Sequence, residues 1–466
     1  MDNSEYQIDF TKPVSAHFIG IGGSSMSGLA ELLHKRGFRV SGSEKNPGDS
    51  CRRLEELGIA VRCGHHASNI TEDIGFVVYT AAVSGDNPEL AAARAAGIPT
   101  LTRAEFLGQL MGQYKDAISV AGTHGKTTTA SMLSAILLEA GMDPTISVGA
   151  VLESVHSNSR TGHSEHFVVE SCEYRNSFLS FRPAHEIILN IEAEHLDFFR
   201  DIDDIRHSFR LFMEKLKEGS HLVIQGDIAG LAVLTEGLKA DIATYGIAAQ
   251  GKTYDYSAEN ISWDGQGCGS YDLMHGKTAL AHVSLGVVGR HNVLNSVAAA
   301  AMADLLGVPL TDISNALRSF GGASKRFEKK GEFGGVTVID DYAHHPTEIR
   351  ATLDAAANYP HKQIWCVFQP HTFSRTKKLL DDFAEALTMA DHVVLADIYP
   401  SREEDPGDIS SRDLLLKLEK YGKDVHYFPS FGEIENFLLL NCANGDLLIT
   451  MGAGDIVKVG EELLKR

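Results

Sequence analysis

Apolar and polar residues alternate along the chain in blocks that are typical of strands followed by helices. In the first block the pattern predicts, in order, a strand at residues 16–19, a helix from Ser25 to Arg36, a strand at residues 38–40, a strand at residues 76–80 and an alanine-rich helix at residues 87–97. Gly37 ends the first helix, and Pro88 could open the second at its first turn. This order predicts a β-α-β nucleotide-binding domain that ends near residue 108.

Two further blocks repeat the alternation. The second contains predicted strands at residues 117–120, 167–169, 186–189 and 221–224, a glycine-rich stretch at 265–276 that indicates a hairpin, and an alanine-rich helix at 293–306. The third contains predicted strands at residues 336–339, 364–368, 393–395 and 447–450, and Gly321-Gly322 before it reads as a hinge. We therefore expect three consecutive α/β domains with mostly parallel sheets, at residues 1–108, 109–322 and 323–466.

Composition and charge narrow the class of protein. Of the 466 residues, 43% are hydrophobic and 22% charged, which is ordinary for a soluble α/β enzyme. No stretch approaches the roughly 18 uninterrupted apolar residues of a membrane span, and the start shows no signal-peptide pattern, so we expect a cytoplasmic protein without membrane insertion. The net charge of −20 disfavours nonspecific binding to nucleic acid. The six cysteines contain no Cys-x-x-Cys pair, which argues against a disulfide framework or a zinc site.

Residues 122–129, Gly-Thr-His-Gly-Lys-Thr-Thr-Thr, form a candidate phosphate-binding loop. The loop follows an apolar strand and precedes a helical pattern, so backbone N–H groups and the positive end of a helix dipole would point at a polyphosphate. Lys126 would reach the β- and γ-phosphates of ATP, and the Thr127 hydroxyl would hold Mg²⁺. The strict pattern has a glycine where Val120 stands, so the loop opens at Gly122 and is two residues tighter. Gly-Lys-Thr also occurs by chance, but strand, loop and helix together favour the phosphate site.

A second glycine turn, from Gly20 to Gly28, opens the first predicted helix. It departs from the dinucleotide-binding pattern, whose third glycine would fall at Ser25. A glycine turn before a helix suits a diphosphate, and Glu44, at the end of the next strand, could accept hydrogen bonds from a ribose or a base. The alternative is that these glycines only allow the strand and the helix to pack closely.

Polar clusters follow several other predicted strands. Glu170–Glu173 and Asn190–Asp197 offer carboxylates and a histidine beside the phosphate loop, where Mg²⁺ would bind. Asn292 is expected to cap the alanine-rich helix, and amides of this kind can read an adenine edge. Residues 340–347 and 369–376 place polar and cationic groups at two equivalent strand-to-helix corners, which suggests one face built for a charged intermediate. Ordinary helix capping explains part of each cluster.

The combination of these segments resembles the Mur ligase family. The segments are Gly-Thr-His-Gly-Lys-Thr-Thr-Thr at 122–129, Glu-Ala-Glu-His-Leu-Asp at 192–197, Gly-Arg-His-Asn-Val-Leu-Asn at 289–295, Asp-Asp-Tyr-Ala-His-His-Pro-Thr-Glu at 340–348 and Phe-Gln-Pro-His-Thr-Phe-Ser-Arg-Thr at 368–376. The resemblance runs from about residue 15 to residue 460 and implies a Rossmann-like domain for a UDP-sugar, a central P-loop ATPase-like domain, and a Rossmann-like C-terminal domain for an amino acid.

Carried over by motif, the resemblance implies a set of binding residues for each ligand. They are Gly20, Gly22, Gly23, Ser24, Ser25, Met26, Ser27, Glu44 and His65 for the UDP-sugar; Gly122, Thr123, His124, Gly125, Lys126, Thr127, Thr128, Asn292, Asn295, Lys325 and Arg326 for ATP; Thr127, Glu173 and His195 for Mg²⁺; and His344, His371 and Arg375 for the acyl phosphate and the incoming amine. The implied catalytic residues are Lys126, Glu173, His195, Arg326 and His344.

Two departures from the family pattern refine this expectation. Many relatives have Glu-Ala-Asp-Glu-Ser-Asp where this chain has Glu-Ser-Cys-Glu-Tyr-Arg at 170–175, so the metal role rests on Glu173 and not on Glu170. Other members carry a carbamylated lysine after the His-x-Asp segment, but residues 198–209 contain no lysine. That absence agrees with the branch that joins L-alanine to UDP-N-acetylmuramate, with ATP and Mg²⁺, in peptidoglycan precursor synthesis.

Three other functions remain as alternatives. A ligase that attaches a whole murein peptide to the same sugar nucleotide would share both glycine loops. A non-enzymatic protein gated by ATP would not require the acidic and histidine side chains near the loop. An NAD-dependent dehydrogenase is disfavoured by Ser25 in place of the third glycine and by the Lys126 loop. The sequence is compatible with a monomer or a dimer.

Overall fold

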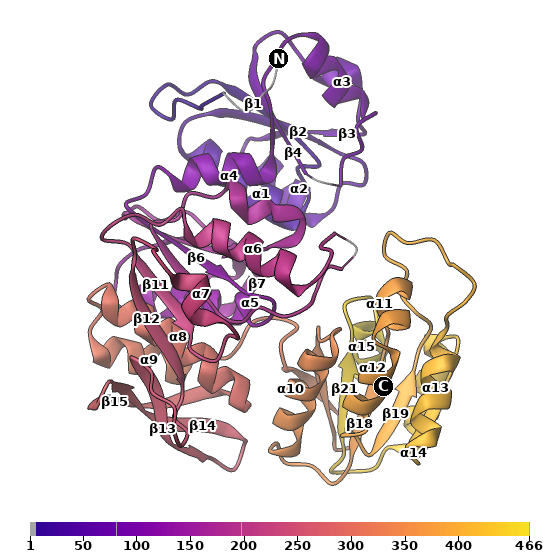
Figure 1. Cartoon of the computed structure of the whole chain (residues 1–466). Coiled ribbons are helices and arrows are strands. Elements are labelled where there is room, and N and C mark those ends of the chain that lie inside the picture. The colour runs from indigo at the N-terminus through magenta and orange to yellow at the C-terminus, as the bar shows by residue number, and fades with distance from the viewer. Residues whose placement is uncertain (1–5, 81, 197, 466) are drawn as a thin grey trace. The chain divides into compact units, whose positions relative to one another are not determined.

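A computed structural model describes residues 6–80, 82–196 and 198–465 of the chain. The chain forms two compact units, one made of residues 1–257 and 297–313 and the other of residues 258–296 and 314–466. Figure 1 shows helices and strands alternating along most of the chain. The predicted α/β class with mostly parallel sheets is confirmed.

The first sheet of unit 1 has five strands in the order β3-β2-β1-β4-β5. Its strands are β1 (Ser15–Ile19), β2 (Arg39–Glu44), β3 (Ala60–Cys63), β4 (Ile74–Tyr79) and β5 (Thr100–Thr102), and its helices are α1 (Ser24–Lys35), α2 (Asp49–Glu56), α3 (Pro88–Ala95) and α4 (Arg103–Met111). All the strands pair in parallel. β2 extends four residues beyond its predicted end at residue 40, because Ser43 is buried and pairs with Ile19 of β1.

The second sheet of unit 1 positions the phosphate loop. Its strands in unit 1 follow the order β12-β11-β10-β6-β9-β7-β8. They are β6 (Asp116–Ala121), β7 (Thr145–Leu152), β8 (Ser157–Arg160), β9 (His166–Ser171), β10 (His185–Ile188), β11 (His221–Gln225) and β12 (Asp241–Ile247), with helices α5 (Lys126–Glu139), α6 (Ile202–Met213) and α7 (Leu231–Thr235). β6 pairs in parallel with β9 and with β10, so the loop that follows it emerges in the middle of the sheet.

One apolar core joins the two sheets of unit 1. A single cluster of buried side chains includes Phe18 of β1, Phe106 of α4, Phe167 of β9, and Phe178, which lies between β9 and β10. Helix α4 approaches the segment η4 (Tyr174–Ser180) so closely that a Cβ added at Gly108 would lie 1.9 Å from the Ser180 carbonyl oxygen. The absence of a side chain at Gly108 therefore allows this contact.

Residues 258–296 of unit 2 contain antiparallel strands. These are the greater part of β13 (Tyr256–Trp263), together with β14 (Cys268–His275) and β15 (Thr278–Val288), and α8 (Arg290–Leu305) and α9 (Leu310–Ser319) follow along the chain. The prediction of a hairpin at residues 265–276 is only partly right, because this stretch holds one whole strand and the turns at both of its ends. Gly267 and Gly276 have φ values of 78° and 56°, which make both turns possible.

The C-terminal sheet of unit 2 has six strands in the order β16-β17-β21-β18-β19-β20, and only β16 is antiparallel to its neighbour. The strands are β16 (Glu328–Phe333), β17 (Val336–Asp341), β18 (Ile364–Phe368), β19 (His392–Leu395), β20 (Asp424–Tyr427) and β21 (Leu447–Met451), and the helices are α10 (Pro346–Ala357), α11 (Phe373–Lys378), α12 (Leu380–Leu387), α13 (Ser411–Lys420), α14 (Phe431–Asn441) and α15 (Val457–Leu463). Cys366 belongs to one apolar cluster, whereas Trp365 and Val367 belong to another. The sheet is therefore buried on both faces, as is typical of the Rossmann-like domain that the resemblance implies.

Among the described residues, the helices are all too short or too polar to pass through a lipid bilayer.

Candidate active site

The phosphate loop has the backbone shape that its sequence predicts. Gly122 and Gly125 have φ values of 143° and 84°, and α5 begins at Lys126, directly after Gly125. A Cβ added at Gly122 would lie 2.9 Å from the Leu189 Cβ, so the loop packs directly on the end of β10. The residues predicted for phosphate binding therefore surround the N-terminus of a 14-residue helix.

Asn190, just after β10, holds the loop in place. Its side-chain oxygen accepts from the His124 N–H at 2.7 Å, and its side-chain amide donates to the His124 carbonyl at 3.0 Å. The Thr123 N–H donates to the Asn190 carbonyl at 3.1 Å. The Thr123 hydroxyl accepts from the Glu192 N–H at 2.9 Å. Four hydrogen bonds thus fix the first half of the loop to the neighbouring strand end.

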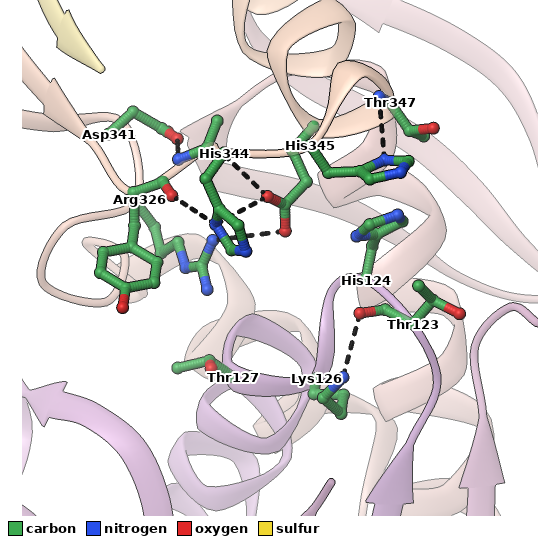
Figure 2. Close-up of polar contacts among 12 residues, drawn as sticks. Thr123, His124, Lys126, Thr127, Arg326, Asp341, His344, His345 and Thr347 are labelled. Atoms are coloured by element: carbon green, nitrogen blue, oxygen red, sulfur yellow. Dashed lines mark hydrogen bonds and ion pairs between the residues drawn. The ribbon is translucent and has the colours of Figure 1, made fainter. Parts of the chain in front are cut away.

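Lys126 is held inside the loop by oxygen atoms (Figure 2). Its ammonium group donates to the carbonyls of Gly122 and Thr123 and lies 3.1 Å from Glu173 Oε2. Burial alone would lower the pKa of Lys126, but the charges of Glu173, Cys172 and Glu170 outweigh burial and raise it. Lys126 is therefore a permanent cation at the position from which a phosphate-loop lysine reaches a nucleotide.

Thr127 pairs with the carboxylate of Glu170, a residue for which the sequence predicted no metal role. The Thr127 hydroxyl donates to the Glu170 carboxylate at 2.9 Å, and the Gly149 N–H donates to Glu170 Oε2 at 2.6 Å. Glu170 lies next to the last residue of β9, the strand that pairs with β6. Thr127 and Glu170 therefore form a hydroxyl–carboxylate pair of the kind that holds Mg²⁺ directly or through water.

Glu173 and His195, the two other predicted metal ligands, also lie together. His195 Nε2 is 3.9 Å from Glu173 Oε1, and the His195 ring lies 4.6 Å from that of Tyr174. Within the described part of the chain, Glu173 Oε1 is buried and has no hydrogen-bond partner. An uncompensated buried carboxylate oxygen is costly, so the residues present fit a bound cation. Asp197, at the end of the same predicted segment, lies outside the described residues.

The glycine turn of the first sheet also leads into a helix. Gly20 has a φ of 77°, and α1 begins at Ser24. The Gly22 N–H donates to Glu44 Oε2 at 3.1 Å, which places the predicted ribose acceptor beside the turn. Met26 and Ser27, two of the predicted UDP-sugar residues, are buried in the first turn of α1.

His65, the predicted uridine-side residue, belongs to a buried polar network. The Ser43 hydroxyl donates to Glu89 Oε2 at 2.5 Å, so it must accept the hydrogen bond that joins it to His65 Nδ1 at 2.8 Å. Asn69 also donates to Glu89, and His17 Nε2 lies 3.6 Å from its other oxygen. Burial raises the pKa of Glu89, but the neighbouring His17, Ser43 and Asn69 side chains outweigh it and lower the value to about 2.

In unit 2, Asn292 and Asn295 lie in the first two turns of α8. The prediction that Asn292 caps this helix is wrong, because the helix begins two residues earlier, at Arg290. The Asn292 amide instead donates to the Val288 carbonyl at 2.8 Å, and its oxygen accepts from the Asn295 amide at 3.1 Å. Both side chains are buried and fixed by these bonds.

Arg326 of unit 2 faces an aromatic ring and two carboxylates. Its guanidinium carbon lies 5.4 Å from the centre of the Tyr342 ring, and its Nη1 is 4.0 Å from Glu348 Oε1. Asp341 fixes the same loop, because its carboxylate accepts from the N–H groups of Phe327 and Ala343 at 2.8 Å each. Burial raises the pKa of Asp341, and Arg326 partly offsets this effect. Lys325 Nζ lies 5.9 Å from the same Tyr342 ring.

His344 and His345 occupy the turn before α10 (Figure 2). His344 Nδ1 lies 3.0 Å from the Tyr342 carbonyl, which can only accept, so this nitrogen carries a proton. Glu348 Oε2 lies 3.3 Å from His344 Nδ1 and accepts from the backbone N–H of His344 at 3.0 Å. His345 Nδ1 accepts from the Thr347 N–H at 3.4 Å and so caps the helix. His344 therefore has in Glu348 the carboxylate partner expected of a proton-handling residue.

His371 and Arg375 form the second predicted corner of unit 2. The Arg375 guanidinium donates to the His371 carbonyl at 2.6 Å and lies 3.1 Å from His371 Nδ1. Burial, with the charges of His344 and Arg375, lowers the pKa of His371 to about 4. The His344 and His371 rings are 5.9 Å apart. The two corners of the predicted amino-acid side are thus brought together.

Known proteins resemble this chain over nearly its whole length. Sequence profiles described as "Mur ligase family, catalytic domain", "Mur ligase middle domain" and "Mur ligase, glutamate ligase domain" match residues 15–115, 120–303 and 325–454. The UDP-N-acetylmuramate–L-alanine ligase of Lachnoclostridium phytofermentans is 58% identical over 99% of this chain and 100% of its own length. That of Agathobacter rectalis is 57% identical over the same shares. This chain belongs to the Mur ligase family.

Solved structures of other Mur ligases have the same fold. The UDP-N-acetylmuramate-alanine ligase of Thermotoga maritima superposes with a TM-score of 0.80 at 29% identity, over 97% of this chain and 99% of that one. A murein peptide ligase from Psychrobacter arcticus gives 0.71 at 25% identity, over 97% and 98%. The fold of this Mur ligase is thus shared by enzymes whose names give different amino components.

Several residues that shape the sites of this Mur ligase were not predicted from the sequence. Glu170 and Asn190 were visible as polar residues after buried strands, which is the signal that identified their neighbours. Glu348 ends a quoted motif but was given no role. Glu403 accepts from the Ser374 N–H at 2.9 Å, yet it comes from a loop 29 residues away, and no local pattern relates the two.

Proposed function

We propose that this chain is an ATP-dependent ligase that joins L-alanine to the lactyl carboxylate of UDP-N-acetylmuramate and releases ADP and phosphate. The observation that carries the proposal is the phosphate loop with Lys126 and the Thr127–Glu170 pair, in a chain 58% identical to a protein of that name. A carboxylate does not react with an amine at neutral pH, because its oxygen is a poor leaving group. Phosphoryl transfer removes this obstacle.

The proposed reaction has two steps. A lactyl carboxylate oxygen attacks the γ-phosphorus of ATP, the bond to the β-phosphate oxygen breaks, and ADP leaves an acyl phosphate behind. The neutral amine of L-alanine then attacks the acyl carbon, inorganic phosphate leaves with the C–O electron pair, and the amine proton passes to solvent or to a base. No protein side chain becomes covalently attached, so the protein contributes position and charge.

Unit 1 would bind both nucleotides. Lys126 would exchange its carbonyl partners for phosphate oxygens while keeping Glu173 as its counter-charge. Thr127 and Glu170, with Glu173 and His195, would hold Mg²⁺, which neutralises phosphate charge when bound. The turn at Gly20, with Glu44 and His65, would bind the UDP part of the sugar nucleotide. ATP and Mg²⁺ are the cofactors that this proposal requires.

Unit 2 would supply the remaining charges. Arg326 and Lys325 would stabilise the transferring phosphoryl group, and Asn292 and Asn295 would lie on the adenine side. His344, His371 and Arg375 would bind the acyl phosphate and the amino acid. The lowered pKa of His371 keeps this side chain neutral near pH 7, so it can accept a proton or a hydrogen bond from the alanine ammonium group.

The proposal is tested by measuring ADP release from the full-length protein with UDP-N-acetylmuramate and one amino component at a time. L-Alanine should support turnover better than glycine, L-serine or a murein tripeptide. Lys126→Ala should abolish turnover while the protein remains folded, and Lys277→Ala, at an exposed turn, serves as the control. Near-normal turnover of Lys126→Ala contradicts the proposal, and stimulation by the tripeptide alone would replace alanine with a peptide.

A further inference from the structure

Arg103 is a cation at the boundary between the two sheets of unit 1. It is the first residue of α4, and a capping box fixes the start of that helix. In this box the Glu105 carboxylate accepts from the Thr102 N–H at 2.7 Å and from the Thr102 hydroxyl at 2.9 Å, so the nearest acid along the chain is already used. Helix α4, which carries Arg103 at its first position, packs on η4 through Gly108.

The guanidinium group of Arg103 points at the glycine turn of the first sheet. Its Nη1 donates to the Ser25 hydroxyl at 3.1 Å. A guanidinium has five N–H groups, and four of them have no acceptor among the residues that the structure describes. Burial lowers the pKa of Arg103, and the charges of Cys172 and Glu170 offset this only in part. The side chain stays charged at neutral pH in any case.

A second contact from the other sheet converges on the same turn. Asn158, on β8, donates from its side-chain amide to the Ser24 hydroxyl at 2.7 Å and to the Ser24 carbonyl at 3.2 Å. A Cβ added at Gly28 would lie 2.3 Å from the Ser159 Oγ, so α1 and β8 are in close contact. The first turn of α1 is therefore enclosed by donors from its own helix, from Asn158 and from Arg103.

Burial costs Arg103 part of its hydration, and among the described residues no carboxylate forms an ion pair with it, so the nearby charges offset this loss only in part. An anion that bridges the remaining N–H groups would compensate this loss, and the planar fork of arginine matches two phosphate oxygens at once. Glu170 acts on Arg103 electrostatically and would repel an anion, whereas Ser25 offers a hydroxyl at the N-terminus of α1. The most favourable position for an anion is therefore next to Ser25, at the N-terminus of α1.

We propose that Arg103 binds the diphosphate of the sugar nucleotide, together with the backbone N–H groups at the start of α1. This inference rests on the proposed function, because it takes the ligand of that turn to be a UDP-sugar. Arg103 is then a substrate-binding residue that lies 78 positions along the chain from Ser25 of the glycine turn. Its contribution is to ground-state and transition-state binding alike, so KM should change more than kcat.

Calorimetric titration of the full-length protein with UDP and with UDP-N-acetylmuramate tests this assignment. Arg103→Met keeps the apolar stem and removes the charge, and it should weaken both ligands by at least about 10-fold, the effect expected for lost charge-assisted hydrogen bonds. Arg103→Lys should recover part of this loss, because it restores the charge without the fork. Arg182→Met, which removes an arginine bonded to Gln7 on the surface, should bind both ligands as the wild type does.

Each outcome decides between readings. If UDP binds Arg103→Met as tightly as the wild type while UDP-N-acetylmuramate binds weakly, Arg103 holds the lactyl carboxylate and the diphosphate assignment is wrong. If both ligands bind both Arg103 variants normally, Arg103 has no binding role. If the wild type itself binds neither ligand, the proposed function fails and this inference with it. Thermal unfolding without ligand is measured for each variant, and the Arg103→Lys titration decides the assignment if Arg103→Met is unstable.

Discussion

The buried carboxylate of Glu89 should make the first sheet of unit 1 sensitive to acid. Its side chain is fully buried, and Ser43, Asn69 and His65 surround it with hydrogen-bond donors. The pKa of about 2, against an ordinary value of 4.5, is a difference of 2.5 units. At 1.36 kcal/mol per unit, the ionised form contributes about 3 kcal/mol to stability at neutral pH.

The sign of the effect follows from the lowered pKa. A carboxyl group whose pKa falls on folding contributes its full stabilisation above the unfolded value, near 4.5, and loses it as the pH falls toward 2. Glu89→Gln keeps the shape and one acceptor oxygen but removes the charge. The variant should therefore be about 3 kcal/mol less stable than the wild type at pH 7. The difference should shrink steadily between pH 4.5 and pH 3.

Hydrogen exchange of the β1 and β2 amides, measured by mass spectrometry from pH 7 to pH 3 and corrected for the intrinsic rate at each pH, reports this stability locally. Both tryptophans, Trp263 and Trp365, lie in unit 2, so tryptophan fluorescence shows whether the other unit is unaffected. Glu55→Gln, at an exposed position of α2, is the matched control and should change neither signal. A stability difference between Glu89→Gln and the wild type that stays constant from pH 7 to pH 3 would refute the reasoning.

Two further changes test the packing of unit 1. Both oxygens of Glu186 are buried without a hydrogen-bond partner among the described residues, and burial raises the pKa of this side chain well above the ordinary value. Glu186→Gln should therefore be more stable than the wild type at pH 8 and equal to it at pH 4, as measured by amide exchange of β10. A loss of stability at both pH values would contradict this prediction. Gly108→Ala should lower the melting temperature by several degrees, because the added Cβ would lie 1.9 Å from the Ser180 oxygen. Gly432→Ala, in open space on α14, is the control and should not lower it. Equal melting temperatures for the two variants would show that α4 can shift freely.

The sequence predicted the fold where hydrophobic periodicity and local motifs agree. β6, the phosphate loop and α5 follow from consecutive residues, and the long apolar runs of β17, β18 and β21 identify a sheet that is buried on both faces. The N-terminus of α8 was misplaced because Asn292 is a favourable capping residue. The chain starts the helix at Arg290 instead, where the positive φ of Gly289 allows the turn.

Long-range pairing limited the prediction of the sites. Glu170 was discounted because the segment that contains it, residues 170–175, departs from the family pattern, but the pairing of β9 with β6 places it beside Thr127. Arg103 and Ser25 belong to different local patterns, and their contact depends on how α4 packs. Such contacts depend on tertiary packing, which a pattern of neighbouring residues does not predict.

The hydrogen bonds that join Asn190 and Glu192 to the phosphate loop have a thermodynamic consequence. Asn190 precedes His195 by five residues on the same connection after β10, so the loop and this candidate metal ligand share one segment of backbone. A displacement of that segment by a cation would alter the loop, and a nucleotide that ordered the loop would alter the cation site. Because such coupling is reciprocal, nucleotide and cation should change each other's affinity by the same factor.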